Sequence, residues 1–302
     1  MNNRIEWLDL SKGIAIILMV LGHTSLPDFL SRFIWAFHMP LFFIASGWTT
    51  NWMKYDLKGF ASKKMQSLMV PFIVYSAIVL LIQIDVGWNS AETFFVNGWA
   101  GYALWFIPVL FMALICSKIL YSIQRTSIRY IVLFLFVAVG YGLSFFKIHL
   151  PWTLSSVPYA TLMLVLGSEM KKLPKRYLRP RWYSVLILLS LTIMISRFFR
   201  LDMCFNRIIP ILPITIGAVS GTLFVFQLSM LCEKYFKSLA KVFISIGRET
   251  YIIVAFSQIT IMLLNEYFHF NVALKYGLLV LVLVALKYMK DAINRLFNTK
   301  IL

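Results

Sequence analysis

Two histidines lie in consecutive apolar stretches near the start of the chain. His23 is near the end of the first stretch, residues 7–26, and His38 is inside the second, residues 30–50. An ionisable side chain within a membrane span is a candidate functional residue, because burying it costs stability. Imidazole, with an unperturbed pKa of about 6.5, can take a proton from a hydroxyl at neutral pH. His23 is the first candidate for such a base. His38 could orient His23, contact the acceptor or brace the kink at Pro40.

A lysine and an aspartate share a helix with His23. The eleven steps from Lys12 to His23 rotate the helix by about 20° net and advance it by about 16 Å, so both side chains lie on one face. Asp9 falls within about 60° of the same stripe. This spacing suits a long ligand with an anionic head and a reactive tail, and acyl-coenzyme A has that shape. In the competing interpretation, Lys12 reaches to lipid headgroups and Asp9 is its ion-pair partner or a favourable anion in the first helical turn.

The composition is that of a polytopic membrane protein. Of the 302 residues, 60% are hydrophobic and 14% charged, and the mean hydropathy is +0.80. A soluble domain of this size needs more polar surface. The net charge of +17 would suggest nucleic acid in a soluble protein, but here the basic residues lie in short loops between apolar segments. We therefore expect membrane lipids as partners and no nucleic acid. The three irregularly spaced cysteines indicate neither a disulfide framework nor a metal site.

The hydropathy pattern predicts an all-α helical bundle of about ten transmembrane helices in a single domain, residues 1–302. The first helix lacks a cleavage site and is expected to be retained. No internal repeat or long connecting loop divides the chain. The predicted segments are roughly 7–26, 30–50, 69–86, 100–122, 130–147, 152–170, 183–199, 206–231, 243–268 and 272–290.

The distribution of charge predicts the orientation of this bundle. With the N-terminus in the cytoplasm, 23 of the 29 Lys and Arg residues lie on the cytoplasmic side. The other six lie outside, and Arg197, Arg200 and Arg207 cluster among them around Asp202. This bias favours an even number of spans with both termini cytoplasmic. The outside arginines could hold an anionic acceptor or a lipid phosphate, although a solvated rim is the simpler interpretation.

Several motifs follow a recognisable order along the chain. They are Arg4, Asp9, Lys12-Gly13, Gly22-His23, Phe37-His38-Met39-Pro40-Leu41-Phe42-Phe43, Ser46-Gly47, Lys63 and Lys64 ahead of Pro71-Phe72, Leu104-Trp105-Phe106-Ile107-Pro108, and Ile246-Gly247. In these motifs the chain resembles the acyltransferase 3 family of integral membrane acyltransferases. The string around His38 is most similar to the fucose 4-O-acetylase-like branch of that family.

The resemblance implies transfer of an acetyl group from cytoplasmic acetyl-coenzyme A to a hydroxyl of a cell-surface or lipid-linked glycan. It also implies a multi-pass protein of the bacterial cytoplasmic membrane. The family's pattern of a basic residue and a histidine eleven positions later maps onto Lys12 and His23. Asp9, Lys12, Lys63 and Lys64 are then candidates for binding the donor, and no metal is expected.

The chain departs from the family pattern at two places and in length. Lys64 and Ser67 stand where many members carry two arginines, and Ser257-Gln258 stands where many carry a histidine. No extracytoplasmic esterase-like domain follows the membrane segments. A transporter that uses buried His, Lys and Asp as a proton relay is the alternative function, and a non-catalytic assembly factor is a third. Glu169 could pair with a neighbouring lysine or touch a ligand, Trp105 could belong to the core or line a pocket, and a homo-oligomer stays open.

Overall fold

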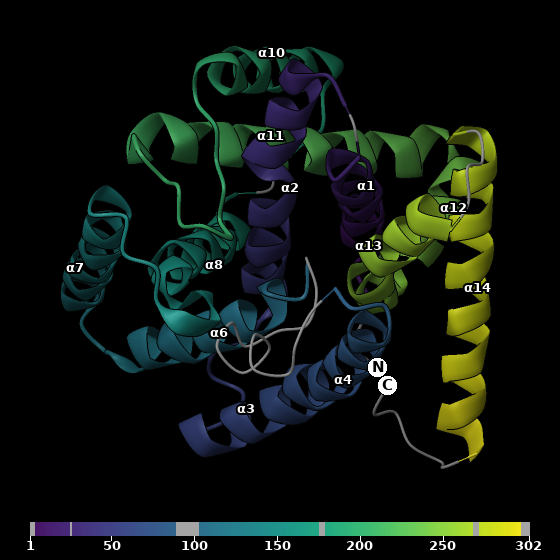
Figure 1. The fold of residues 1–302 in the computed structure, drawn as a ribbon. Coiled ribbons are helices and arrows are strands. Elements are labelled where there is room, and N and C mark those ends of the chain that lie inside the picture. The colour runs from purple at the N-terminus through teal and green to yellow at the C-terminus, as the bar shows by residue number, and fades with distance from the viewer. Residues whose placement is uncertain (1–3, 25, 89–102, 175–178, 268–271, 297–302) are drawn as a thin grey trace.

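The computed structural model describes residues 4–24, 26–88, 103–174, 179–267 and 272–296, which fold into helices and form no strand. Figure 1 shows α2 near the middle of the bundle, with α7 and α14 at opposite edges. The elements are α1 (Glu6–Gly22), α2 (Asp28–Thr49), α3 (Leu57–Lys64), the π-helical turn η1 (Met65–Met69), α4 (Val70–Asp85), α6 (Phe106–Ser122), α7 (Thr126–Phe145), the short 3-10 turn η2 (Pro151–Ser156), α8 (Val157–Lys172), α10 (Trp182–Phe198), α11 (Ile211–Tyr235), α12 (Lys237–Arg248), α13 (Thr250–Tyr267) and α14 (Val272–Leu296).

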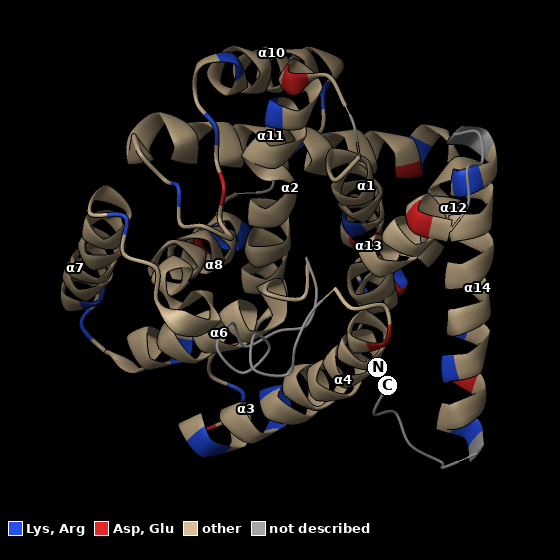
Figure 2. Cartoon of the chain, in the orientation of Figure 1, with Lys and Arg blue, Asp and Glu red and all other residues tan. Residues whose placement is uncertain are grey.

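Each of the ten predicted apolar segments overlaps a helix, so the prediction of an all-α protein is confirmed. Within the described residues, four helical stretches are long and apolar enough to cross a membrane: Asp28–Thr49, Leu57–Asp85, Thr126–Phe145 and Ile211–Tyr235. Two shorter apolar helices, α6 and α10, accompany them. The charged residues gather near helix ends and in connecting segments (Figure 2). The number of spans stays a prediction.

The structure differs from the predicted segments at two places. Residues 57–64, expected as a polar loop, form α3, because Asp56 caps its N-terminus by accepting a hydrogen bond from Gly59 N at 3.0 Å. The π-helical turn η1 then joins α3 to α4 without a break. Segment 243–268 is divided at Glu249 into α12 and α13. The basic, amphipathic α12 buries Ala240, Ile244 and Gly247, one face of three turns, and packs against α1.

The helix α2 packs against α1, α8, α10 and α11. Its contact with α8 is close enough for backbones to touch. A Cβ added to Gly47 would lie 1.9 Å from the Leu164 carbonyl oxygen, and one added to Gly167 would lie 2.0 Å from the Ile44 carbonyl oxygen. Glycines at such contacts let membrane helices approach closely where larger residues would hold them apart. This reciprocal pair fixes the position of α2 in the bundle.

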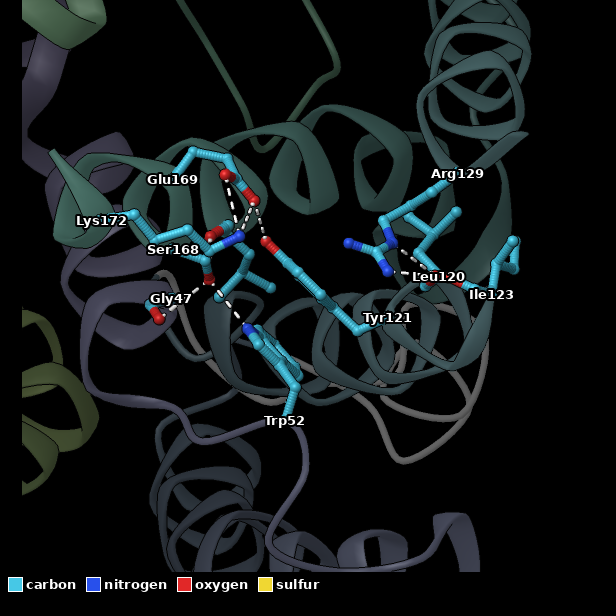
Figure 3. A network of polar contacts seen from close by, with 10 residues as sticks. Gly47, Trp52, Leu120, Tyr121, Ile123, Arg129, Ser168, Glu169 and Lys172 are labelled. Carbon is cyan, nitrogen blue, oxygen red and sulfur yellow. Dashed lines mark hydrogen bonds and ion pairs between the residues drawn. The ribbon is translucent and has the colours of Figure 1, made fainter. Parts of the chain in front are cut away.

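A network of polar contacts ties the segment after α2 to α8 (Figure 3). The buried Ser168 hydroxyl donates to the Gly47 carbonyl at 3.0 Å and accepts from Trp52 Nε1 at 2.9 Å. The Trp52 ring stacks on Tyr121 of α6 with centroids 5.0 Å apart. Lys118 Nζ donates a hydrogen bond to the Trp52 carbonyl oxygen at 2.6 Å. Together these contacts join α2, α6 and α8 at the end of the bundle away from His23.

The same network decides the role of Glu169. Its carboxylate accepts from Tyr121 OH at 2.8 Å and from Lys172 Nζ at 2.7 Å (Figure 3). Glu169 therefore has the lysine partner that the sequence offered as one of two interpretations. Its carboxylate serves the packing of α6 on α8.

Candidate active site

The structure brings the two histidines together. His23 directly follows the end of α1, and His38 lies in the middle of α2. Their ring centroids are 6.5 Å apart, and the indole of Trp35 lies 5.7 Å from one ring and 6.2 Å from the other. Trp35 Nε1 donates to the Gly22 carbonyl at 3.1 Å, which ties α2 to the end of α1. The two candidate histidines therefore lie in one cluster of two imidazoles and one indole.

The ring of His38 is buried and held in one tautomer. It is 4% exposed, and its Nδ1 lies 2.9 Å from the Ile34 carbonyl oxygen. A carbonyl only accepts hydrogen bonds, so Nδ1 carries the proton and Nε2 of the neutral ring keeps its lone pair. The carbonyl that Pro40 leaves without its helical partner belongs to Ala36, four residues earlier. His38 therefore does not brace that carbonyl, which was one of its predicted roles.

The ring of His23 is in a different situation. Its side chain is half-buried, and no hydrogen bond joins its ring to another residue in the described part of the chain. Within the described structure both ring nitrogens are consequently available to a ligand. The ring of His38 is therefore held by the backbone, whereas the ring of His23 has no hydrogen bond in the described structure.

Both histidines line one cavity of about 780 Å³. Its walls come from the end of α1, the first half of α2, the end of α4, the start of α6, the 200–205 loop and α13. Trp105 also lines it while being 5% exposed, so this residue belongs to both the core and the cavity. A concave, largely apolar space with a few polar groups is typical of a small-molecule site.

Sequence reasoning did not place Arg200 and Gln258 among the polar residues of the cavity. The guanidinium of Arg200 lies 4.9 Å over the Trp35 ring and lines the cavity, while the Arg200 side chain as a whole stays exposed. Gln258 is 7% exposed, and its Nε2 has no hydrogen-bond partner among the described residues. In the sequence, Arg200 is one of the clustered outside arginines, and Gln258 belongs to the polar pair Ser257-Gln258 inside an apolar segment. Neither signal places these side chains beside the histidines without the fold.

The loop that carries Arg200 is held by a buried aspartate. Asp202 accepts from Phe205 N at 3.3 Å through its carboxylate, and its backbone pairs with that of Arg207. Burial raises the pKa of the Asp202 carboxyl, and the charges of Arg207 and Arg200 partly oppose this rise. The predicted cluster around Asp202 thus shapes one wall of the cavity.

Lys12 and Asp9 lie away from the histidine cavity. The Asp9 carboxylate is buried, and it lies 2.7 Å from Lys12 Nζ, 2.9 Å from Arg4 Nε and 3.7 Å from Arg248 Nε. Asp9 is therefore the ion-pair partner of Lys12, as in the competing interpretation. Three cations around one carboxylate leave surplus positive charge. The Lys12 side chain also keeps 27% of its surface exposed.

Lys63 and Lys64 lie on α3 and do not line the histidine cavity either. Lys63 Nζ donates to Tyr55 OH at 2.9 Å, while Lys64 Nζ lies 5.6 Å from the centre of the Phe60 ring. No ion pair links these lysines to Asp9 in the described ranges. The four predicted donor-binding residues therefore form two separate basic regions.

Comparison with known proteins identifies the family of the chain. The family model described as an acyltransferase domain, that of acyltransferase 3, matches residues 5–289. This range includes both histidines, Arg200 and Gln258. No curated protein and no solved structure matches the chain. Since the family model covers nearly all 302 residues, the chain belongs to the acyltransferase 3 family and is a membrane acyltransferase.

Proposed function

We propose that this enzyme moves an acetyl group from cytoplasmic acetyl-coenzyme A to a hydroxyl of a cell-surface or lipid-linked glycan. The observation that carries the proposal is the cavity in which His23, with no hydrogen bond to its ring in the described structure, faces the fixed ring of His38. A thioester is already activated, but a sugar hydroxyl is a poor nucleophile that needs a general base.

His23 takes the proton of the acceptor hydroxyl as that oxygen attacks the thioester carbonyl carbon. The carbon–sulfur bond then breaks, and the proton passes from the imidazolium to the departing thiolate of coenzyme A. The spare N–H donors of Gln258 Nε2 suit the oxygen that gains negative charge during this step. Every group in the step is a side chain of the cavity or a substrate atom.

His38 receives a positioning role. With ring centroids 6.5 Å apart, the two imidazoles are too far apart for a direct hydrogen bond, and one hydroxyl oxygen fits between them. That hydroxyl gives its single proton to His23, and the lone pair on His38 Nε2 accepts from a second hydroxyl of the sugar. The Ile34 carbonyl keeps His38 in the required tautomer.

The donor is assigned to the opposite end of α1. The surplus positive charge of Arg4, Lys12 and Arg248 around Asp9 attracts the phosphates of coenzyme A, with Lys63 and Lys64 as further candidates. The acetylated end then has to travel about 16 Å along α1 to reach His23. Donor and acceptor thus approach from opposite faces of the membrane.

Loss of the charge on Lys12 should weaken donor binding more than the chemical step. We expect Lys12→Met to raise the KM for acetyl-coenzyme A about ten- to hundred-fold, since a charge-assisted contact to phosphate contributes about 1.5–3 kcal/mol. Lys12→Arg should keep most of the affinity. Initial rates in proteoliposomes at varied donor and acceptor concentrations test this. An unchanged donor KM with a lower melting temperature would reduce Lys12 to a partner of Asp9.

The orientation of the chain is a prediction that can be tested separately. We propose ten spans in a bacterial cytoplasmic membrane, with both termini and the loop between α8 and α10 in the cytoplasm. Reporter fusions at the termini and thiol labelling of a Lys172→Cys variant should all report the cytoplasmic side. Labelling of the introduced thiol from outside intact cells would contradict the ten-span arrangement and the assignment of the donor side.

The function itself is tested by mass spectrometry of surface and lipid-linked glycans from cells with and without the protein. We expect a difference of one acetyl group per modified sugar. A glycan that changes in amount but not in acetylation would favour the alternative of an exporter. Purification in mild detergent followed by mass photometry would establish whether the enzyme is a homo-oligomer.

A further inference from the structure

A second cavity lies beside the histidine cavity, between the first turns of α2 and the last turns of α10. Its volume is about 660 Å³, and α10 packs against α2 along it. Most of its wall is apolar, from Phe29, Leu30, Phe33, Leu189 and Ile193. We call this cavity the α2–α10 groove.

The α2–α10 groove is on the part of the surface that faces lipid. Phe29 is 67% exposed and Ile193 is 51% exposed. In a membrane protein, large exposed apolar side chains on apolar helices lie against acyl chains. An occupant of this groove therefore enters from the bilayer and carries a hydrocarbon chain.

The charges at the groove favour an anionic headgroup. Asp28 and Arg32 neutralise each other, with Arg32 Nε 2.7 Å from Asp28 Oδ2. Arg197 also lines the groove and forms no ion pair with any described residue. Arg200 follows three residues later, and no carboxylate of the described chain lies within ion-pair distance of it. Arg197 thus brings to the groove a guanidinium with no ion-pair partner in the described structure, and Arg200 brings another to the histidine cavity. Guanidinium is well suited to bind phosphate.

Helix α2 connects the groove to the histidine cavity. Its first turns give Phe29 and Phe33 to the groove, and Ser31, Trp35 and His38 to the cavity. Arg200 stacks on Trp35, which itself touches both histidine rings. Arg197 lines the groove and Arg200 lines the cavity, so a phosphate that contacts both guanidinium groups would have one substituent in each space.

Resting on the proposed function, we propose that the acceptor is a lipid-linked sugar and that the α2–α10 groove is its lipid site. The hydrocarbon tail occupies the groove, the phosphate binds Arg197 and Arg200, and the sugar enters the histidine cavity. The acceptor is then recognised as an anionic amphiphile, and its reacting hydroxyl is presented to His23 by the anchored phosphate.

A binding measurement with polyprenyl phosphate, which has the tail and the phosphate but no sugar, tests the site without catalysis. Native mass spectrometry of the purified protein in detergent gives the dissociation constant. We expect Arg197→Gln and Arg200→Gln each to weaken binding about ten-fold. Ile193→Trp, which fills the groove, should weaken it at least about three-fold. Arg181→Gln and Ile187→Trp change the same residue types on or beside α10 outside the groove, and should bind as the unchanged protein does.

Two results would overturn the proposal. One is equal binding by the groove variants and their controls. The other is displacement of polyprenyl phosphate by an equal concentration of phosphatidylglycerol, which would mean that the groove binds bulk phospholipid. Acetylation measured in parallel separates this inference from the proposed function. Normal acetyl transfer without polyprenyl phosphate binding refutes only the lipid site, whereas selective binding in a protein that transfers no acetyl group refutes only the proposed reaction.

Discussion

Replacement of His23 by alanine should reduce acetyl transfer by a factor on the order of 10²–10⁴, the usual contribution of a general base. Among the described residues, the other imidazole that lines the cavity is that of His38, and its buried ring is bound to the Ile34 carbonyl. The His23 ring forms no hydrogen bond within the described structure, so its removal should leave expression and melting temperature near those of the unchanged protein. The measurement is the initial rate of acetyl transfer by membranes with equal amounts of enzyme.

The chain offers a matched control for this substitution. His149 is exposed and does not line the histidine cavity, so His149→Ala should keep the full rate. Near-normal transfer by a well-inserted His23→Ala protein would remove His23 from the mechanism. In that case His38, with its free Nε2, would become the candidate base.

Alanine at Gly47 or Gly167 should strongly destabilise the protein. Each new Cβ would lie about 2 Å from a backbone carbonyl of the facing helix, and neither backbone can move aside without separating α2 from α8. Overpacking usually costs about 1–3 kcal/mol, and a clash with backbone belongs at or above the upper end. We expect a lower melting temperature and loss of the monodisperse peak in size-exclusion chromatography.

Gly142 on α7 provides the comparison, because a Cβ there meets nothing within 4 Å. Gly142→Ala should be neutral or raise stability by up to about 1 kcal/mol, since alanine favours helix more than glycine does. If Gly47→Ala and Gly142→Ala melt alike, α2 and α8 are farther apart than the structure has them.

The apolar segments could be predicted from the sequence because each has a composition that only a helix in or near a membrane explains. α3 was missed because it is short and polar, and its helical form depends on the cap at Asp56 and on continuity with α4. The division at Glu249 was missed because the amphipathic α12 and the apolar α13 adjoin without a proline or a loop. In both cases hydropathy along the sequence does not change at the residue where the helix begins.

The site was predictable where it is local. His23 and His38 are fifteen residues apart on adjoining helices, so their chemistry and their proximity both follow from the sequence. Arg200 and Gln258 come from distant parts of the chain, and only the packing of α10 and α13 brings them to the cavity. Lys12 contacts Asp9 as its place in the sequence allows, but the contact of Arg248 with that carboxylate depends on the approach of α12.

The ion pairs of Asp9 also bear on how the protein is made. A membrane chain is synthesised from its N-terminus, so the first helix exists long before α12. Arg4 and Lys12 are close to Asp9 in the chain and contact its carboxylate from the same helical end. They can neutralise it as soon as α1 leaves the ribosome, whereas Arg248 arrives near the end of synthesis. The first helix therefore enters the membrane with the Asp9 carboxylate already paired with Arg4 and Lys12. Helix α12 adds the third cation when it is made.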